Sequence, residues 1–182
     1  MRILIVYGTT DGHTRHLARF MAHRLQGAGN DVALFDAVEE GLPDPKSFDA
    51  ALIAASLHMG HFQSAVVHFA RRHHEALNAM QSAFVCVSLS AAGDDPEDWA
   101  GLKQCVDRFE AATLWKPRAI HHAEGAILFT AYDFFRKLAM REIARKRGQP
   151  VTTDGDYDYT DYEALGRFVD DFVAGKAPAA AA

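Results

Sequence analysis

The residues with the clearest chemical potential form the segment GTTDGHT at positions 8–14. Three threonine hydroxyls, a glycine and several backbone amides stand directly before a stretch with helical spacing, and the dipole of a helix favours an anion at that end. The segment therefore predicts a phosphate-binding loop without a lysine. It matches neither GxxxxGK[ST], the loop of many nucleoside triphosphatases, nor GxGxxG, the dinucleotide fingerprint. An ordinary helix-capping turn, with Thr10 or Asp11 as the N-cap residue, is the alternative interpretation.

A second candidate loop is SLHMGHF at positions 56–62. Gly60 permits a close approach of the backbone to a ligand, and the neighbouring side chains can pack over it or hydrogen-bond to it. His58 and His61 have the HxxH spacing of a metal pair, but without a third ligand this is a weak signature. We therefore predict no metal site.

The elements that must position these loops alternate between strand and helix. Such alternation predicts crossover units and a doubly wound, five-stranded parallel sheet in the order 2-1-3-4-5. Ligands bind such sheets at the carboxyl ends of the strands, so the loops 8–14, 56–62 and 88–95 are expected to share one site. The expected strands are Arg2–Tyr7, Asp31–Phe35, Ala50–Ala55, Ala83–Leu89 and Ala119–Leu128, and helical spacing marks Leu17–Leu25, Val66–Leu77, Trp99–Phe109 and Leu165–Phe172.

Length and composition fit one globular domain and exclude several classes of protein. The chain has 182 residues, of which 49% are hydrophobic and 24% charged, and its mean hydropathy is −0.13. A net charge of −5 argues against a nucleic-acid binder, and two cysteines are too few for a secreted disulfide scaffold. Without a signal peptide or a long apolar run, we expect a cytoplasmic protein. One domain is predicted over residues 1–175, followed by a flexible tail at 176–182.

One segment, residues 129–159, breaks the alternation and is interpreted as an insertion after the fifth strand. Between residues 134 and 147 it has a single acid, Glu142, and an imperfectly amphipathic helical pattern. Such a helix can receive an acidic substrate or lie at an anionic membrane surface, or it can be an edge helix with a solvated basic face. Its six basic residues are Arg136, Lys137, Arg141, Arg145, Lys146 and Arg147.

The first loop resembles the phosphate-binding loop of the flavodoxin family, T/S-x-T-G-x-T. Thr9, Thr10, Gly12 and Thr14 fill the corresponding places, while Asp11 stands where many flavodoxins have threonine. The resemblance extends to the quinone-dependent protoporphyrinogen oxidases, the FMN type of bacterial haem synthesis, from residue 1 to about 173. It rests on the order and spacing of YGTTDGHTR, AASLHMGHFQSAV, SAFVCVSL, WKPR, EGAI, YDFFRKL and YTDYEAL.

The resemblance implies an FMN site made by the three loops. The first loop would hold the phosphate, and the other two would hold the ribityl chain and the ring. The implied cofactor-binding residues are Thr9, Thr10, Asp11, Gly12, His13, Thr14, Ser56, Leu57, His58, Met59, Gly60, Ser88, Leu89, Ser90, Ala91, Ala92 and Gly93. No catalytic base is identifiable; His58 and His61 are candidates by location only.

The resemblance also implies the reaction. A porphyrinogen would be oxidised, and FMN would pass its electrons to a membrane quinone. Arg136, Lys137, Arg141 and Arg145 would serve the substrate carboxylates or a peripheral membrane contact. The loop after the fourth strand departs from the family, in which it is often basic. Its acids at positions 94, 95, 97 and 98 either alter substrate docking or favour the dipole of the following helix.

Two other functions remain open from the sequence. A flavodoxin-type electron carrier would have the same flavin loops, but the basic insertion disfavours it, because carriers commonly present an acidic face around the flavin. An NAD(P)H-quinone reductase is the other, although no nicotinamide-specific element is visible. The sequence makes no prediction of oligomeric state.

Overall fold

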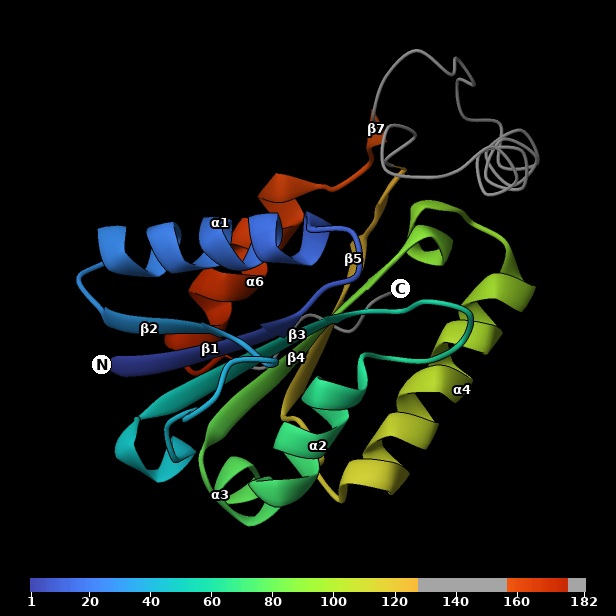
Figure 1. Cartoon of the computed structure of the whole chain (residues 1–182). Coiled ribbons are helices and arrows are strands. Elements are labelled where there is room, and N and C mark those ends of the chain that lie inside the picture. Colours follow the sequence, from blue (N-terminus) through green and yellow to red (C-terminus); the bar gives the residue numbers. More distant parts are fainter. Residues whose placement is uncertain (128–156, 177–182) are drawn as a thin grey trace.

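The computed structural model describes residues 1–127 and 157–176. Five parallel strands form the central sheet in the order β2-β1-β3-β4-β5, which confirms the predicted fold class (Figure 1). The strands are β1 (Arg2–Gly8), β2 (Asp31–Asp36), β3 (Ala50–Ser56), β4 (Gln81–Ser88) and β5 (Ala119–Glu124).

Helices cover both faces of this sheet, because successive side chains of a buried strand point to opposite faces. Ile3 and Ile5 of β1 are buried on the face covered by α1 and α6, whereas Leu4 and Val6 are buried on the face covered by α2, α3 and α4 (Figure 1). The helices are α1 (His13–Gly27), α2 (Ser64–Arg72), α3 (His74–Ala79), α4 (Pro96–Thr113) and α6 (Tyr162–Val173), and η1 (Pro45–Ser47) and η2 (Leu89–Ala92) are short 3-10 turns.

An aromatic cluster fixes α4 against the sheet. The rings of Phe84 and Phe109 stack at 4.6 Å, and Trp115 meets both edge-on. Trp115 is fully buried, and its indole N–H donates to Ser82 Oγ at 2.9 Å. This bond removes the cost of burying the indole nitrogen, so the end of α4 is held firmly beside the start of β4.

Two predicted elements are wrong in extent. The single helix expected over Val66–Leu77 is divided at His73, whose backbone leaves the helical conformation. The centroid of its ring lies 4.8 Å from that of Phe69, and its Nδ1 lies 4.0 Å from Asp44 Oδ1. The strand expected over Ala119–Leu128 leaves the sheet after Glu124. Its continuation, β6 (Ala126–Ile127), pairs with β7 (Tyr157–Asp158) in an antiparallel ribbon instead.

The ribbon joins the two ends of the segment that the structure leaves out. Ala126 pairs with Asp158 and Ile127 with Tyr157, so residues 128–156 begin and end at one place beside β5 (Figure 1). The basic residues Arg136, Lys137, Arg141 and Arg145 lie outside the described residues, as does the tail at 177–182. Within residues 1–127 and 157–176, no helix is long and apolar enough to cross a membrane.

Candidate functional site

A cavity of about 210 Å³ lies at the carboxyl ends of β1, β3 and β4. All three predicted loops contribute to its wall, so the structure brings most of the expected site residues together. Thr10, Gly12, Ala91, Ala92 and Gly93 belong to these loops without lining the cavity. The lining residues are Thr9, Asp11, His13, Thr14, Ser56, Leu57, His58, Met59, Gly60, Val87, Ser88, Leu89, Ser90, Gly125 and Ala126.

The first loop turns sharply into α1 at Gly12. This residue has a φ of +90°, a conformation that glycine adopts at little cost, and its N–H donates to Thr9 Oγ1 at 2.8 Å. Gly12 is therefore the N-cap residue, and the expectation of Thr10 or Asp11 in that position is wrong. Within the described part of the chain, no side chain caps α1. The first backbone N–H groups of this 15-residue helix are thus left to donate to another acceptor.

Thr14, in the first turn of α1, fits such an acceptor. The residue is fully buried, and its Oγ1 has no hydrogen-bond partner in the described structure. Buried hydroxyls are nearly always paired, because an unpaired one costs about 1–3 kcal/mol. A phosphate oxygen at the start of this helix would accept a hydrogen bond from the Thr14 hydroxyl, and its negative charge would complement the helix dipole. The residues present therefore fit the phosphate of a flavin nucleotide.

The second loop forms a tight turn at the rim of the cavity. His58 and His61 bond through their backbones in both directions, at 2.9 and 3.0 Å, and the two residues between them have positive φ, +50° at Met59 and +80° at Gly60. The two histidines of the HxxH segment are thus residues that pair through their backbones across a tight turn. Met59 projects outward with 88% of its surface exposed, which is unusual for a large apolar side chain.

Gln63 is a site residue that the sequence reasoning missed. Its Nε2 donates to Thr10 Oγ1 at 3.0 Å and to Ser56 Oγ at 2.6 Å, so one amide joins the first loop to the end of β3. Its Oε1 is buried without a partner in the described residues. The available signal was a polar residue immediately before the apolar spacing of α2.

The third loop is organised by hydrogen bonds of its own. The N–H of Ala91 donates to Ser88 Oγ at 3.2 Å, which closes η2, and Trp99 Nε1 donates to the carbonyl of Gly93 at 2.8 Å. Asp95 caps α4 by accepting the N–H of Glu97 at 2.8 Å, with Pro96 in the first turn. Part of the acidic cluster is therefore a helix cap, as the dipole interpretation expected.

Gly125 brings the ribbon to the cavity and was also missed by the sequence reasoning. Its N–H donates to the carbonyl of Ser88 at 2.9 Å, and a Cβ there would lie 3.1 Å from backbone atoms of Ser88 and Leu89. Only glycine fits this close approach without a backbone shift. Ala126, the first residue of β6, consequently lines the cavity.

His13 connects the first loop to the chain after the ribbon. Thr160 donates its hydroxyl to the carbonyl of Glu124 at 2.9 Å, so it accepts from His13 Nε2, also at 2.9 Å. Asp158 lies 3.6 Å from the same nitrogen. Burial lowers the pKa of His13, and the nearby Asp158 carboxylate opposes that decrease. His13 is thus held as a neutral donor that ties the cavity wall to β7.

The family follows from a comparison with known proteins. The model of the flavodoxin domain matches residues 4–154. The chain belongs to the flavodoxin family. Solved flavodoxins share the architecture: TM-scores are 0.58 both for oxidised flavodoxin 1 of Bacillus cereus, 12% identical, and for the flavodoxin of Streptococcus pneumoniae, 17% identical. Each alignment covers 96% of this chain, with 98% and 99% of the respective flavodoxins.

Relatives of higher identity place the chain within a narrower group of this family. It is 30% identical over 177 residues to protoporphyrinogen IX dehydrogenase [quinone] of Leishmania major, covering 95% of this chain and 75% of that protein. It is 30% identical over 170 residues to the protein of the same name from Escherichia coli K12, covering 92% of both. The chain is therefore a flavodoxin-fold oxidoreductase from the group that contains these dehydrogenases.

Proposed function

We propose that this protein is an FMN-dependent dehydrogenase that oxidises protoporphyrinogen IX to protoporphyrin IX and passes the electrons to a membrane quinone. The observation that carries the proposal is the buried, unpartnered hydroxyl of Thr14 at the uncapped start of α1, inside a cavity that all three loops line. The names of the relatives supply the substrate and the acceptor.

The loops suit FMN better than a larger flavin nucleotide. One terminal phosphate would bind at the start of α1, through Thr9, Gly12 and Thr14 and the amides around them. The ribityl chain and ring would then extend between the loops 56–60 and 88–93. When bound, the flavin supplies the redox chemistry by accepting two electrons at a time and releasing them to an acceptor.

The protein side chains have a positioning role in this proposal. Leu57 and Met59 bring apolar surface to the rim of the cavity, and Gln63 holds the first loop against β3. No nucleophile is required, because the flavin performs the electron transfer. His58 and His61 remain the candidates for moving a proton at the rim.

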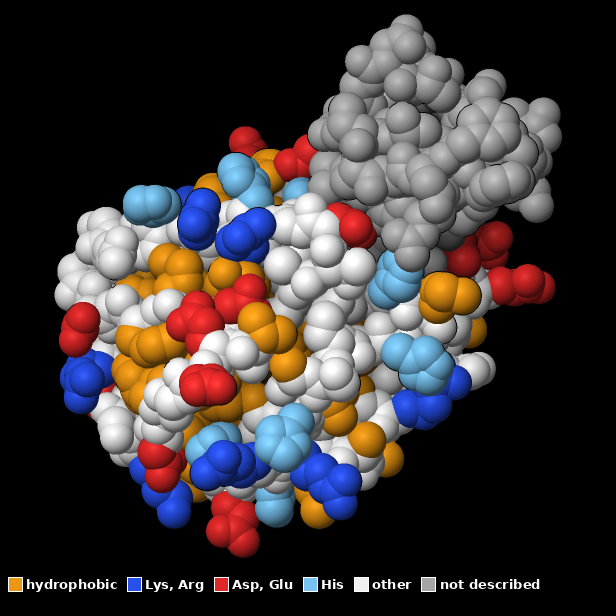
Figure 2. Space-filling view, in the orientation of Figure 1, with side chains coloured by type: hydrophobic (Ala, Val, Ile, Leu, Met, Phe, Trp, Pro, Cys, Tyr) orange, Lys and Arg blue, Asp and Glu red, His pale blue; other side chains and the backbone are white. Residues whose placement is uncertain are grey.

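The segment between β6 and β7 is proposed to receive the substrate carboxylates or an anionic membrane surface. Its ends lie beside the cavity, since Ala126 lines it and Asp158 pairs with Ala126. On the face seen in Figure 2, Lys and Arg side chains lie in small groups separated by acidic and apolar side chains. Arg136, Lys137, Arg141 and Arg145 would supply the concentrated positive charge, and a peripheral position at the inner face of the cytoplasmic membrane would bring the quinone within reach.

The test is an anaerobic assay of the protein reconstituted with FMN. Protoporphyrinogen IX and a water-soluble quinone are added together, and the fluorescence of protoporphyrin reports the reaction. We expect quinone-dependent formation of porphyrin above the rate without protein. A parallel assay replaces the porphyrinogen with NADH or NADPH. Quinone reduction by a pyridine nucleotide alone would support the reductase, and FMN binding without turnover in either assay would support the electron carrier.

A further inference from the structure

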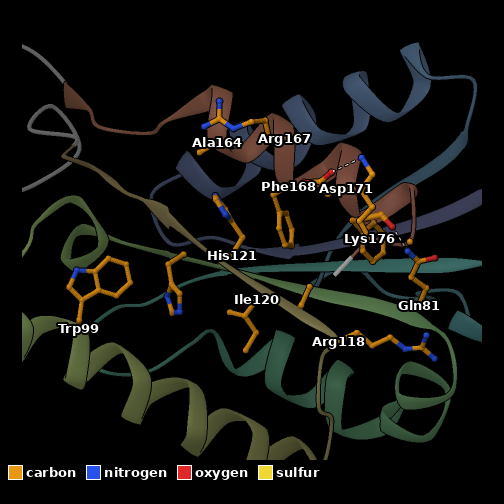
Figure 3. A pocket seen from close by; sticks show the side chains of 14 residues that line it. Gln81, Trp99, Arg118, Ile120, His121, Ala164, Arg167, Phe168, Asp171 and Lys176 are labelled. Atoms are coloured by element: carbon orange, nitrogen blue, oxygen red, sulfur yellow. Dashed lines mark hydrogen bonds and ion pairs between the residues drawn. The ribbon is translucent and has the colours of Figure 1, made fainter. Parts of the chain in front are cut away.

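A second and larger cavity lies along the outer edge of the sheet. Its volume is about 690 Å³, and it is bounded by β5, by the start of α4 and by one side of α6 (Figure 3). It shares no lining residue with the cavity between the three loops. A volume of this size is typical of sites that enclose an organic ligand.

The walls of this edge cavity are aromatic and already ordered. The ring of His121 stacks on Phe168 at 5.0 Å and 25°, and the ring of His122 meets Trp99 edge-on at 5.4 Å. Because neighbouring residues of a strand point to opposite sides, these two pairs flank β5, one toward α6 and the other toward α4. Ile120, two residues before His122, adds apolar surface on the side of α4 (Figure 3). Such walls fit a flat, ring-containing molecule.

The charged groups around the cavity are mainly cationic. Arg118, Arg167 and Lys176 line it, with Asp171 as the lining acid. Asp171 lies 3.4 Å from Lys176, so these two charges largely compensate each other. The guanidinium groups of Arg118 and Arg167 are left to set the sign of the local potential, which favours an anion. Arg167 has an exposed partner, Glu163, at 3.6 Å, and exposed pairs of this kind are weak.

The two histidines contribute hydrogen-bonding groups rather than charge. Burial lowers the pKa of both, that of His121 to about 4, so each ring is neutral at pH 7. His121 Nε2 and His122 Nδ1 are buried and have no hydrogen-bond partner within the described part of the chain. Buried polar nitrogens of this kind are normally satisfied, and the oxygen of a ligand is one means of doing so.

We propose that the edge cavity binds a ring-containing organic anion. The flat apolar part would lie between Trp99 and Phe168, and a carboxylate or sulfonate would lie toward one of the two guanidinium groups, that of Arg118 or that of Arg167. The assignment follows from the volume, the aromatic walls and the guanidinium groups of Arg118 and Arg167, and it does not depend on the proposed flavin chemistry.

The test compares two probes that share one ring system and differ in charge. 2-Naphthoate is an anion, and 2-naphthamide is its neutral counterpart of nearly the same shape. Isothermal titration calorimetry at low ionic strength gives the affinity of each. We expect naphthoate to bind at least fivefold more tightly than naphthamide, and added salt to reduce the difference.

Variants connect the affinity to this cavity. The double substitution Arg118→Gln with Arg167→Gln should weaken naphthoate at least fivefold and leave naphthamide unchanged. Both arginines are exposed, so the fold is expected to tolerate the change. Lys103→Gln is the matched control, because Lys103 is an exposed cation of α4 that pairs with Asp107 and does not line the cavity. It should leave both affinities unchanged.

The two tryptophans of the chain give an independent readout of position. Trp99 lines the cavity, whereas Trp115 is fully buried against Phe84 and Phe109 and does not line it. In ¹⁵N-labelled protein, naphthoate should shift the indole N–H signal of Trp99 and not that of Trp115, with Trp99→Phe assigning the two signals. The proposal is overturned if the Trp99 signal stays fixed, if the double variant binds naphthoate as the parent does, or if naphthamide binds equally well.

Discussion

His13 Nε2 and Asp158 Oδ1 lie 3.6 Å apart, although 145 positions separate the two residues in the sequence. His13 opens the helix at the candidate phosphate site, and Asp158 ends the ribbon that closes the 128–156 segment. Tyr162 donates its hydroxyl to the same carboxylate. The phosphate end of the candidate site and the exit of the segment are therefore held by one hydrogen-bonded cluster.

Asp158→Asn is expected to lower the pKa of His13 further. Burial already lowers this pKa, and the Asp158 carboxylate is the main group that opposes the decrease. Removing the negative charge leaves burial less opposed. An NMR titration of the His13 ring protons measures the change, with Asp107→Asn on the distant face of α4 as the control. An unchanged titration midpoint would show that the two groups are not coupled.

Thr14→Val is expected to weaken FMN binding by about 1.5–3 kcal/mol, because the variant loses a hydroxyl that bonds to a charged group. Fluorescence quenching of FMN on titration with the apoprotein measures the affinity. Thr113→Val is the matched control: Thr113 is also fully buried, but its hydroxyl donates to the carbonyl of Phe109. The control should lose stability and keep its flavin affinity. Equal affinities in Thr14→Val and the parent would exclude Thr14 from the phosphate site.

Gln63→Leu is expected to loosen the first loop. The variant loses the two hydrogen bonds that Gln63 donates to Thr10 and Ser56. Each contributes a net stability of about 1 kcal/mol. We expect a faster release of FMN in stopped-flow measurements and a lower thermal midpoint of the apoprotein. Gln63→Glu keeps the shape and replaces the amide donor with a carboxylate that can accept from the hydroxyls of Thr10 and Ser56, so it should loosen the loop less than Gln63→Leu. A release rate in Gln63→Leu equal to that of the parent would contradict this role.

The stability of the protein is expected to decrease as the pH falls from about 6.5 to 4. Burial, with a smaller contribution from His122, lowers the pKa of His121 to about 4, so in this range the unfolded chain binds a proton that the folded chain does not. Stability then falls by up to about 1.4 kcal/mol per pH unit for this one proton. Urea unfolding at pH 7 and pH 5 measures the difference. His121→Phe should reduce the slope; an identical slope would assign the acid sensitivity to other groups.

The triple substitution Arg136→Gln, Lys137→Gln and Arg141→Gln tests the segment outside the described residues. If these cations attract substrate carboxylates or anionic lipid, the variant should oxidise porphyrinogen more slowly or bind anionic liposomes less, most clearly at low salt. The spectrum of bound FMN should stay the same. Parent-like turnover and liposome binding at low ionic strength would instead favour a solvated edge helix and the electron-carrier function.

The sequence predicted the sheet well because its signals are local. Buried runs such as Ile3–Val6 and the regular spacing of helices are visible in short windows, and they imply the strand order through the crossover connections. The three candidate loops followed from that order. Contacts that depend on two distant segments were not visible. Gln63 bonds to Ser56 and Thr10, which come near it only in the folded chain. Gly125 is required because the chain after β5 passes close to the backbone at the end of β4.

The helix break at His73 and the cap at Gly12 were missed for a different reason. Each is decided by short-range geometry that residue types alone do not show: the ring of His73 packs on Phe69, and Gly12 adopts a positive φ while its N–H donates to Thr9 Oγ1. Side-chain composition favoured Thr10 or Asp11 as the cap, since both are good N-cap residues. The backbone turn removed them from that position.

The antiparallel pairing of Ala126 with Asp158 and Ile127 with Tyr157 has an evolutionary consequence. A segment whose two ends meet can gain or lose residues without changing the register of the sheet that carries it. Each doubling of the length of such a connection adds only about 0.6 kcal/mol to the free-energy cost of joining its two ends. Selection could therefore vary what is presented beside the cavity while the five strands stayed constant. In related chains, we expect insertions and deletions to concentrate between these two pairs of residues.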